Sequence, residues 1–116
     1  MGLSFSTLCV DAHDTHALAS WWSGVLGWPV EVDSDGDVVM HAPEGAGPDW
    51  LFLAVPEDKT LKNRIHFDLR PDDQDAEVAR VLALGARRVD IGQGEQSWVV
   101  LADPEGNEFC ILSGPG

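Results

Sequence analysis

Two short stretches of the chain hold side chains that could take part in chemistry. His66 and Asp68 alternate with apolar residues, so both side chains should project from one face of a strand. Glu108 and Cys110 share a face in the same way near the end of the chain. If these strands lie side by side, His66 and Cys110 could bind a soft metal ion or act as base and nucleophile.

The sequence does not supply all the residues that either a metal site or a nucleophilic active site needs. Two ligands are normally too few for a stable metal site, even with Glu108 and water beside them. Nothing in the sequence identifies the third group that would orient a His66–Cys110 pair for nucleophilic catalysis. The sequence also lacks a glycine-rich phosphate loop, a nucleophile elbow and a dinucleotide-binding fingerprint. We therefore name no catalytic residue and assign no cofactor, and His66 and Cys110 remain the candidates for a divalent metal.

The elements that must position these residues come in two similar halves. A Leu-Gly pair ends a helix-like segment at residues 26–27 and recurs at residues 84–85, an offset of 84 − 26 = 58. A Pro-Glu-Gly turn at residues 43–45 recurs at residues 104–106, and two further blocks repeat in the same order. This repetition indicates two copies of one supersecondary unit.

Each half has the pattern strand, helix, strand, strand, strand. Apolar residues at helical spacing predict helices over about residues 15–26 and 72–84. Asp14 is placed to cap the first helix, and Pro71 precedes the second. Alternating apolar residues between turn signals predict strands over residues 4–11, 29–33, 37–42, 50–55, 63–69, 87–91, 97–102 and 108–113.

These elements predict an α+β fold in one domain, residues 1–116. One half cannot bury both faces of its sheet alone, so we expect two βαβββ modules that form a curved mixed β-sheet around a cleft, with the helices outside. The first module should cover about residues 4–55 and the second about 63–113, joined by a linker at 56–62. The mixed face that holds His66 should line the cleft.

The charge of the chain restricts its partners. Seven basic and 20 acidic side chains give a formal net charge of −13 at pH 7. Such a charge disfavours nucleic acid and anionic membranes. It either attracts cationic ligands or serves solubility alone, and the sequence favours solubility. The sequence contains neither an apolar run of roughly 20 residues nor a basic secretory signal, and its two cysteines are no disulfide framework. We therefore expect a cytoplasmic protein.

Five tryptophans are many for 116 residues. Trp21, Trp22 and Trp28 lie on or beside the first predicted helix, where they should pack in the core. Trp50 and Trp98 begin predicted strands. There each ring can stack on a flat ligand or pack within the fold, and the sequence favours neither.

Several of these features together resemble the vicinal oxygen chelate superfamily of glyoxalases, bleomycin-resistance proteins and extradiol dioxygenases. The features are the paired modules and the segments at residues 21–28 (WWSGVLGW), 64–69 (RIHFDL) and 102–109 (ADPEGNEF). The likeness covers nearly the whole chain and is greatest to the small bacterial glyoxalase-like proteins. It implies the fold more specifically than the activity, because one scaffold can carry many kinds of site.

The resemblance also implies four positions for metal ligands. His66 falls at one of them and is a suitable ligand. Thr7, Phe52 and Cys110 fall at or beside the other three, where metal-dependent members hold histidine or carboxylate ligands. Glu108 shares a face with Cys110 but lies two residues before it. These departures from the family pattern imply a ligand site without a complete set of metal ligands.

We therefore expect a glyoxalase- or bleomycin-resistance-like protein that binds a small organic molecule in the cleft. The alternative is a metal-dependent lyase or dioxygenase that acts on a small oxygenated substrate, so the sequence leaves open whether the chain is an enzyme. Relatives often dimerise and edge strands need cover, so we also expect a homodimer. The predicted lining of the ligand site is His66, Trp98, Trp50, Glu108, Cys110, Thr7 and Phe52.

Overall fold

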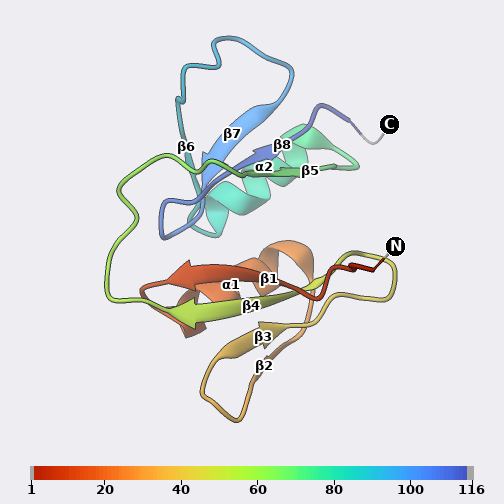
Figure 1. Cartoon of the computed structure of the whole chain (residues 1–116). Helices are drawn as coiled ribbons and strands as arrows, with labels where there is room; N and C mark the ends of the chain where they lie inside the picture. Colours follow the sequence, from red (N-terminus) through yellow and green to blue (C-terminus); the bar gives the residue numbers. More distant parts are fainter. Residues whose placement is uncertain (1, 115–116) are drawn as a thin grey trace. The chain divides into compact units, whose positions relative to one another are not determined.

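The computed structural model of the chain describes residues 2–114 and contains two similar α+β modules (Figure 1). The chain divides into two compact units, Met1–Asp58 and Lys59–Gly116. Each unit holds one helix and one four-stranded mixed sheet within its described residues. The boundary between the units falls inside the segment that the sequence predicts as a linker.

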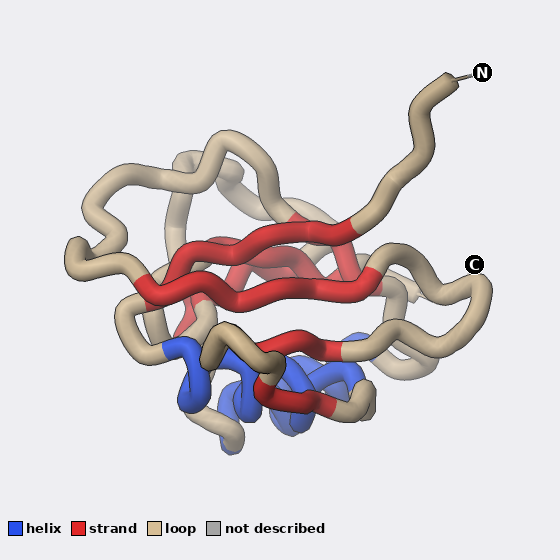
Figure 2. The backbone as a smooth tube through the Cα atoms, turned by 60° about the horizontal axis from the view of Figure 1, so that its bottom comes forward, coloured by secondary structure: helices blue, strands red, loops and turns tan. Residues whose placement is uncertain are grey.

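The first module contains β1 (Thr7–Ala12), α1 (Thr15–Leu26), β2 (Val30–Val32), β3 (Val38–Met40) and β4 (Asp49–Ala54). The strand order in its sheet is β1-β4-β3-β2. β1 runs parallel to β4, and the other neighbouring strands are antiparallel. Helix α1 contacts each of the four strands and covers one face of the sheet (Figure 2).

The second module repeats this plan with β5 (Phe67–Leu69), α2 (Gln74–Ala83), β6 (Arg87–Arg88), β7 (Val99–Ala102) and β8 (Glu108–Ile111). Its strand order is β5-β8-β7-β6, with β5 parallel to β8. The two modules thus share the order and the directions of their strands, as the internal repeat predicts.

An aspartate just before each helix caps its first turn. The carboxylate of Asp14 accepts a hydrogen bond from the Ala17 N–H, and that of Asp73 accepts one from the Ala76 N–H. Each bond satisfies one of the free N–H groups in the first helical turn. Helix α1 has the predicted bounds, whereas α2 begins two residues later than predicted because Asp73 is its cap.

The last turn of the second sheet is built around Asp103, which is only 1% exposed. Its Oδ1 atom accepts hydrogen bonds from the backbone N–H groups of Glu105 and Asn107 at 2.9 and 3.0 Å. The Asn107 side chain also donates to both carboxylate oxygens. These bonds satisfy a buried carboxylate and fix the hairpin between β7 and β8.

Strand β5 is shorter than the sequence predicts. It begins at Phe67 rather than near residue 63, and Ile65 lies outside it with 78% of its surface exposed. The backbone N–H of Asn63 donates to the Glu108 carboxylate instead of to a strand. The predicted strand over residues 63–69 is therefore wrong at its first four positions.

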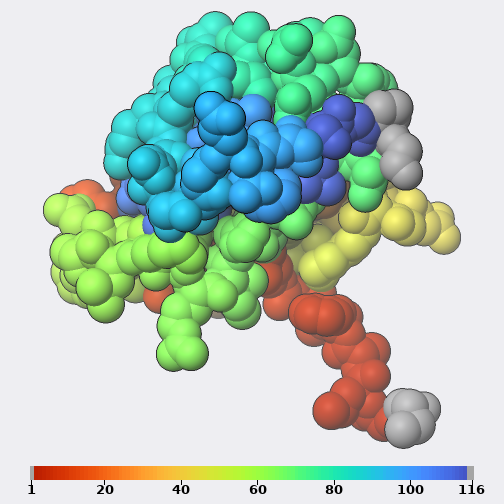
Figure 3. All heavy atoms as spheres, turned by 90° about the horizontal axis from the view of Figure 1, so that it is seen from above, coloured from red at the N-terminus to blue at the C-terminus, as the bar shows by residue number. Residues whose placement is uncertain are grey.

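Strand β1 also starts later than predicted, at Thr7 instead of residue 4. Its parallel partner β4 starts at Asp49, which lies opposite Thr7. Pro48 precedes Asp49 and has no N–H to donate, so the ladder ends there. Residues 2–6 project beyond the start of β1 (Figure 3).

Apolar side chains fill the space between sheet and helix in each module. In the first module the ring of Trp22 on α1 lies 5.2 Å from that of Trp50 on β4, and Phe52 is fully buried. In the second module Val81 of α2, Leu101 of β7 and Phe109 of β8 are each at most 1% exposed. Full burial of such a side chain contributes about 1.5–3 kcal/mol.

The described part of the chain contains no helix with the length and apolar character to cross a membrane.

His41 joins three strands of the first module. It follows β3, and its Nε2 atom lies 3.1 Å from Oε1 of Glu31 on β2, while its Nδ1 atom lies 3.3 Å from Oδ2 of Asp49 on β4. A neutral imidazole can donate through one nitrogen only, whereas the protonated ring donates through both. The hydrogen bond to Glu31, followed by that to Asp49, raises the pKa of His41.

This geometry predicts a pH-dependent contribution to stability. Because the folded pKa of His41 lies above the unfolded value, its stabilisation is complete below about pH 6.5 and is lost as the pH rises through the folded pKa. We expect His41→Gln to reduce the decline in free energy of unfolding between about pH 6 and pH 8, as measured by urea denaturation. His16→Gln, at an exposed position, should keep the wild-type decline. If the free energy of unfolding of His41→Gln declined with pH as steeply as that of the wild type, the stabilising role of His41 would be contradicted.

Candidate functional site

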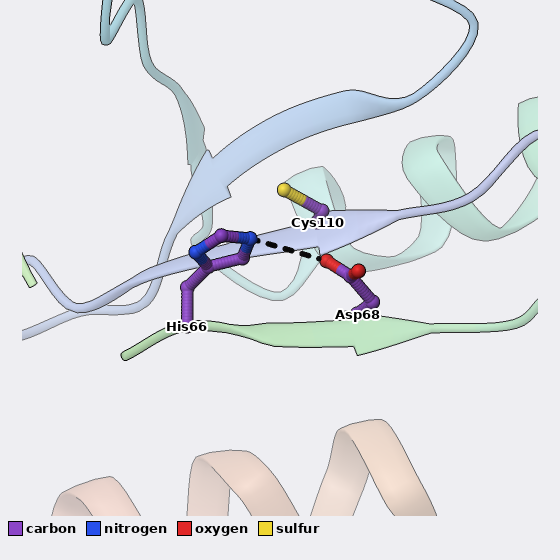
Figure 4. A group of neighbouring side chains, drawn as sticks. All are labelled: His66, Asp68 and Cys110. Atoms are coloured by element: carbon purple, nitrogen blue, oxygen red, sulfur yellow. Dashed lines mark ion pairs between the residues drawn. The ribbon is translucent and has the colours of Figure 1, made fainter. Parts of the chain in front are cut away.

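The parallel pair of β5 and β8 brings together three side chains on one face of the second sheet: His66, Asp68 and Cys110 (Figure 4). Asp68 lies opposite Cys110 in the ladder. His66 stands two residues before Asp68, and its Nε2 atom lies 3.3 Å from the Asp68 Oδ1 atom. One nitrogen, one oxygen and one sulfur atom of the group all lie within 4.8 Å of one another.

The three groups differ in exposure. The side chains of His66 and Asp68 are 41% and 52% exposed, whereas Cys110 is 3% exposed. Burial raises the pKa of the Cys110 thiol, and the charge and hydrogen bond of Asp68 raise it further, against an opposing effect of Lys62. Cys110 is therefore a protonated thiol at neutral pH, and it lacks the thiolate character of a catalytic nucleophile.

These donors fit a metal ion in type but not in spacing. A mixed nitrogen, oxygen and sulfur set suits Zn²⁺ better than Mn²⁺, which prefers oxygen. Tetrahedral zinc with ordinary bond lengths places its nitrogen and sulfur ligands about 3.5 Å apart. The group spans up to 4.8 Å, and Cys110 must first lose its proton. The residues do not form a ready metal site.

Glu108 lies on the same strand as Cys110, but its carboxylate interacts with the loop before β5. Its Oε1 atom lies 3.0 Å from Lys59 Nζ, and its carboxylate accepts from the Asn63 N–H. Burial acts to raise the pKa of Glu108, but the hydrogen bonds from Lys59 and from backbone N–H groups outweigh it, so the pKa is lowered. Glu108 thus anchors residues 59–63 to the sheet, and we assign it to structure instead of ligand binding.

Two of the residues predicted to line a ligand site belong to the core of the first module. Trp50 is 6% exposed, and Phe52 is completely buried. The ring of Trp50 packs against those of Trp22 and Trp28, 5.2 and 6.2 Å away. Both residues pack on the side of the sheet that α1 covers, and their contact with a ligand stays a prediction. Thr7 is exposed on β1. Its neighbour Leu8 is the residue that lies opposite Trp50 in the ladder, so the side chain of Thr7 points to the other face of the sheet.

Trp98 remains available on the second module. It lies just before β7 and is 38% exposed, so its ring can still meet a ligand. The alternation around His66 already pointed to Asp68 as a neighbour. Sequence reasoning missed Lys62 and Lys59, because both lie on a loop whose path no periodicity predicts.

The two cysteines should differ in reactivity. Cys9 is exposed and Cys110 is buried, so a thiol reagent at pH 8 should modify Cys9 quickly and Cys110 slowly. We expect Cys9→Ser to remove the fast phase. In that background Asp68→Asn should accelerate modification of Cys110 at least about threefold, because removal of the negative charge lowers the thiol pKa.

The control for this experiment is Asp72→Asn, which neutralises an exposed acid outside the group. Equal acceleration by both substitutions, or a fast phase that survives Cys9→Ser, would contradict the description of the site.

Comparison with known proteins identifies the family. The glyoxalase-like domain family matches residues 7–112. None of the curated protein sequences compared with the chain matches it. Among similar solved structures is a glyoxalase/bleomycin resistance protein/dioxygenase family enzyme from Burkholderia phytofirmans, with 19% identity and a TM-score of 0.71 over 91% of this chain and 94% of that one.

Two fosfomycin resistance proteins named FosX have similar folds. The protein from Mesorhizobium loti has 17% identity and a TM-score of 0.70, over 98% of this chain and 94% of that one. A mutant of the protein from Listeria monocytogenes, complexed with Mn(II) and 1S,2S-dihydroxypropylphosphonic acid, has 12% identity and a TM-score of 0.74, over 98% and 92%. At these identities the structures show the shared fold. Because the family match spans nearly the whole sequence, the chain belongs to the glyoxalase-like domain family of the vicinal oxygen chelate superfamily.

Proposed function

We propose that this protein binds a small organic molecule on the sheet face of the second module that presents His66, Asp68 and Cys110. The observation that carries the proposal is the convergence of these three polar side chains from two strands, with donor and acceptor atoms within 4.8 Å. Two of the three are open to solvent, so a ligand can reach them. Membership of the glyoxalase-like family supports a small-molecule role.

The chemistry of this face suits a compound with both polar and flat apolar parts. His66 can donate or accept a hydrogen bond, Asp68 accepts, and the Cys110 thiol is a weak donor. Val100 lies opposite Cys110 in the ladder, so the polar group borders on buried apolar side chains. A few convergent polar groups among apolar ones are the usual lining of a small-molecule site, and Trp98 offers a ring for stacking.

Charge favours a cationic aromatic compound over a neutral one. The net charge of −13 raises the local concentration of cations, and Asp68 can form an ion pair at the site. The positive charge of Lys62 is felt at Cys110, so it reduces the preference for a cation on that side of the group. The attraction should weaken as salt rises, because the exposed charges are screened.

Calorimetric titration with cationic aromatic compounds and their neutral analogues tests the proposal. We expect cations to bind better at low salt, and we expect His66→Ala and Asp68→Asn each to weaken the best ligand about tenfold through loss of one polar contact. Trp98→Phe should weaken flat ligands if the ring stacks on them.

The matched controls are His16→Ala and Asp72→Asn, which change the same residue types at exposed positions outside the group. Wild-type affinities in all site variants would refute this location for the site. Equal affinities of cations and neutral analogues at low salt would show that the net charge plays no part in recognition.

A second candidate function is that of a metal-dependent lyase or dioxygenase. The donor types of His66, Asp68 and Cys110 favour it, as does the fold shared with a protein that was crystallised with Mn(II). These three residues would hold the ion, which would polarise an oxygen atom of the substrate. The wide spacing of the donors and the protonated thiol make this the weaker candidate.

A further inference from the structure

The outer edge of the first sheet is formed by β2, which pairs with β3 alone among the described strands (Figure 1). Just after β2, the N–H of Asp33 donates to the carbonyl of Asp37 at 2.8 Å, so these two residues form a hydrogen-bonded pair. Hydrogen-bonded and non-hydrogen-bonded pairs alternate along antiparallel strands. Val30 and Val32 are therefore the residues of β2 whose backbone N–H and C=O groups point away from the sheet.

The same two valines present apolar surface at this edge. They lie opposite Met40 and Val38, which are buried on the side of the sheet that α1 covers. Val30 and Val32 themselves remain 38% and 54% exposed. A lysine, a proline or a bulge often protects a free edge, and β2 contains none of these. The edge can therefore accept a further strand through backbone hydrogen bonds and apolar contacts.

The charge of the first module indicates which kind of strand this edge would accept. Residues 1–58 contain ten acidic side chains and no lysine or arginine, so they carry −10 of the total formal charge of −13. Four of the ten lie within residues 30–37, at Glu31, Asp33, Asp35 and Asp37. His41 contacts Glu31 and offsets its charge only when the imidazole is protonated. Such a field attracts a basic segment and repels an acidic one, β2 of another copy included.

We propose that β2 binds an extended basic segment of another protein as an additional strand of the first sheet. The segment bonds to the outward backbone groups of Val30 and Val32, and its apolar side chains at alternate positions cover the two valines. Its lysine or arginine side chains lie on the face that carries Glu31. The inference uses the first module only, so it can fail or hold independently of the ligand site proposed on the second.

Fluorescence anisotropy at low salt tests the proposal with a labelled peptide of alternating valine and lysine, about eight residues long. We expect this peptide to bind and its valine–glutamate counterpart not to bind. Val32→Pro removes one outward N–H while β2 keeps its bonds to β3, so binding should weaken at least about tenfold. Val32→Thr keeps the N–H and the branched shape, and its affinity should stay within about twofold of the wild type. Urea denaturation of both variants establishes that they remain folded.

A charge reversal tests the contribution of the hairpin. Asp35→Lys should weaken binding of the lysine peptide more than Glu44→Lys, which reverses an exposed acid of the same module outside residues 30–37. Failure of the lysine peptide to bind, or equal binding of the glutamate peptide, would overturn the proposal. Wild-type affinity in Val32→Pro would also overturn it, since charge alone would then hold the peptide.

Amide hydrogen exchange locates the bound segment. The N–H groups of Val30 and Val32 should exchange quickly in the free protein and at least about tenfold more slowly with the lysine peptide, whereas that of Glu31, which faces β3, should be protected in both states. Protection elsewhere without protection of the two valines would contradict the pairing. Slow exchange of the valines in the protein alone, dependent on its concentration, would overturn the proposal by showing that a second copy occupies the edge.

Discussion

The parallel pairing of β5 with β8 fixes which residues of the second module can act together. It sets Asp68 opposite Cys110, and the alternation along β5 then brings His66 to the same face. A shift of one residue would turn Cys110 toward α2 and present Phe109 or Ile111 in its place. The buried side chains of β7 and β8 oppose such a shift, since it would disrupt their close packing.

The strand alternation sufficed to predict that His66 and Asp68 share a face, whereas the position of Cys110 beside them depends on the pairing of β5 with β8. The capping residue and the apolar spacing sufficed to predict α1. Alternation defines two faces of a strand but does not say which face the helix covers, so it could not predict that Phe52 lies in the core of the first module. The length of β5 depends on a hydrogen bond between Asn63 and Glu108, which are 45 residues apart in the sequence. No local pattern contains that information.

The charge around the site differs from that of the whole chain. The net charge is −13, yet Lys59, Lys62 and Arg64 place three of the seven basic side chains just before His66. Lys59 neutralises the buried Glu108, and Lys62 acts on the Cys110 thiol. A metal ion would have to displace the proton of the Cys110 thiol, and Glu108 is already paired with Lys59, so direct binding of an organic compound needs fewer changes at this face than metal binding does.

Elemental analysis tests this account most directly. The protein should be purified without an affinity tag or chelator, and its transition metals should be counted in the wild type and in His66→Ala. We predict no stoichiometric metal in either protein, because the group offers only three donor atoms, up to 4.8 Å apart, and an ion would have to displace the proton of the Cys110 thiol. About one zinc, manganese or iron ion per chain in the wild type, lost in His66→Ala, would contradict the account and make the metal-dependent enzyme the leading function.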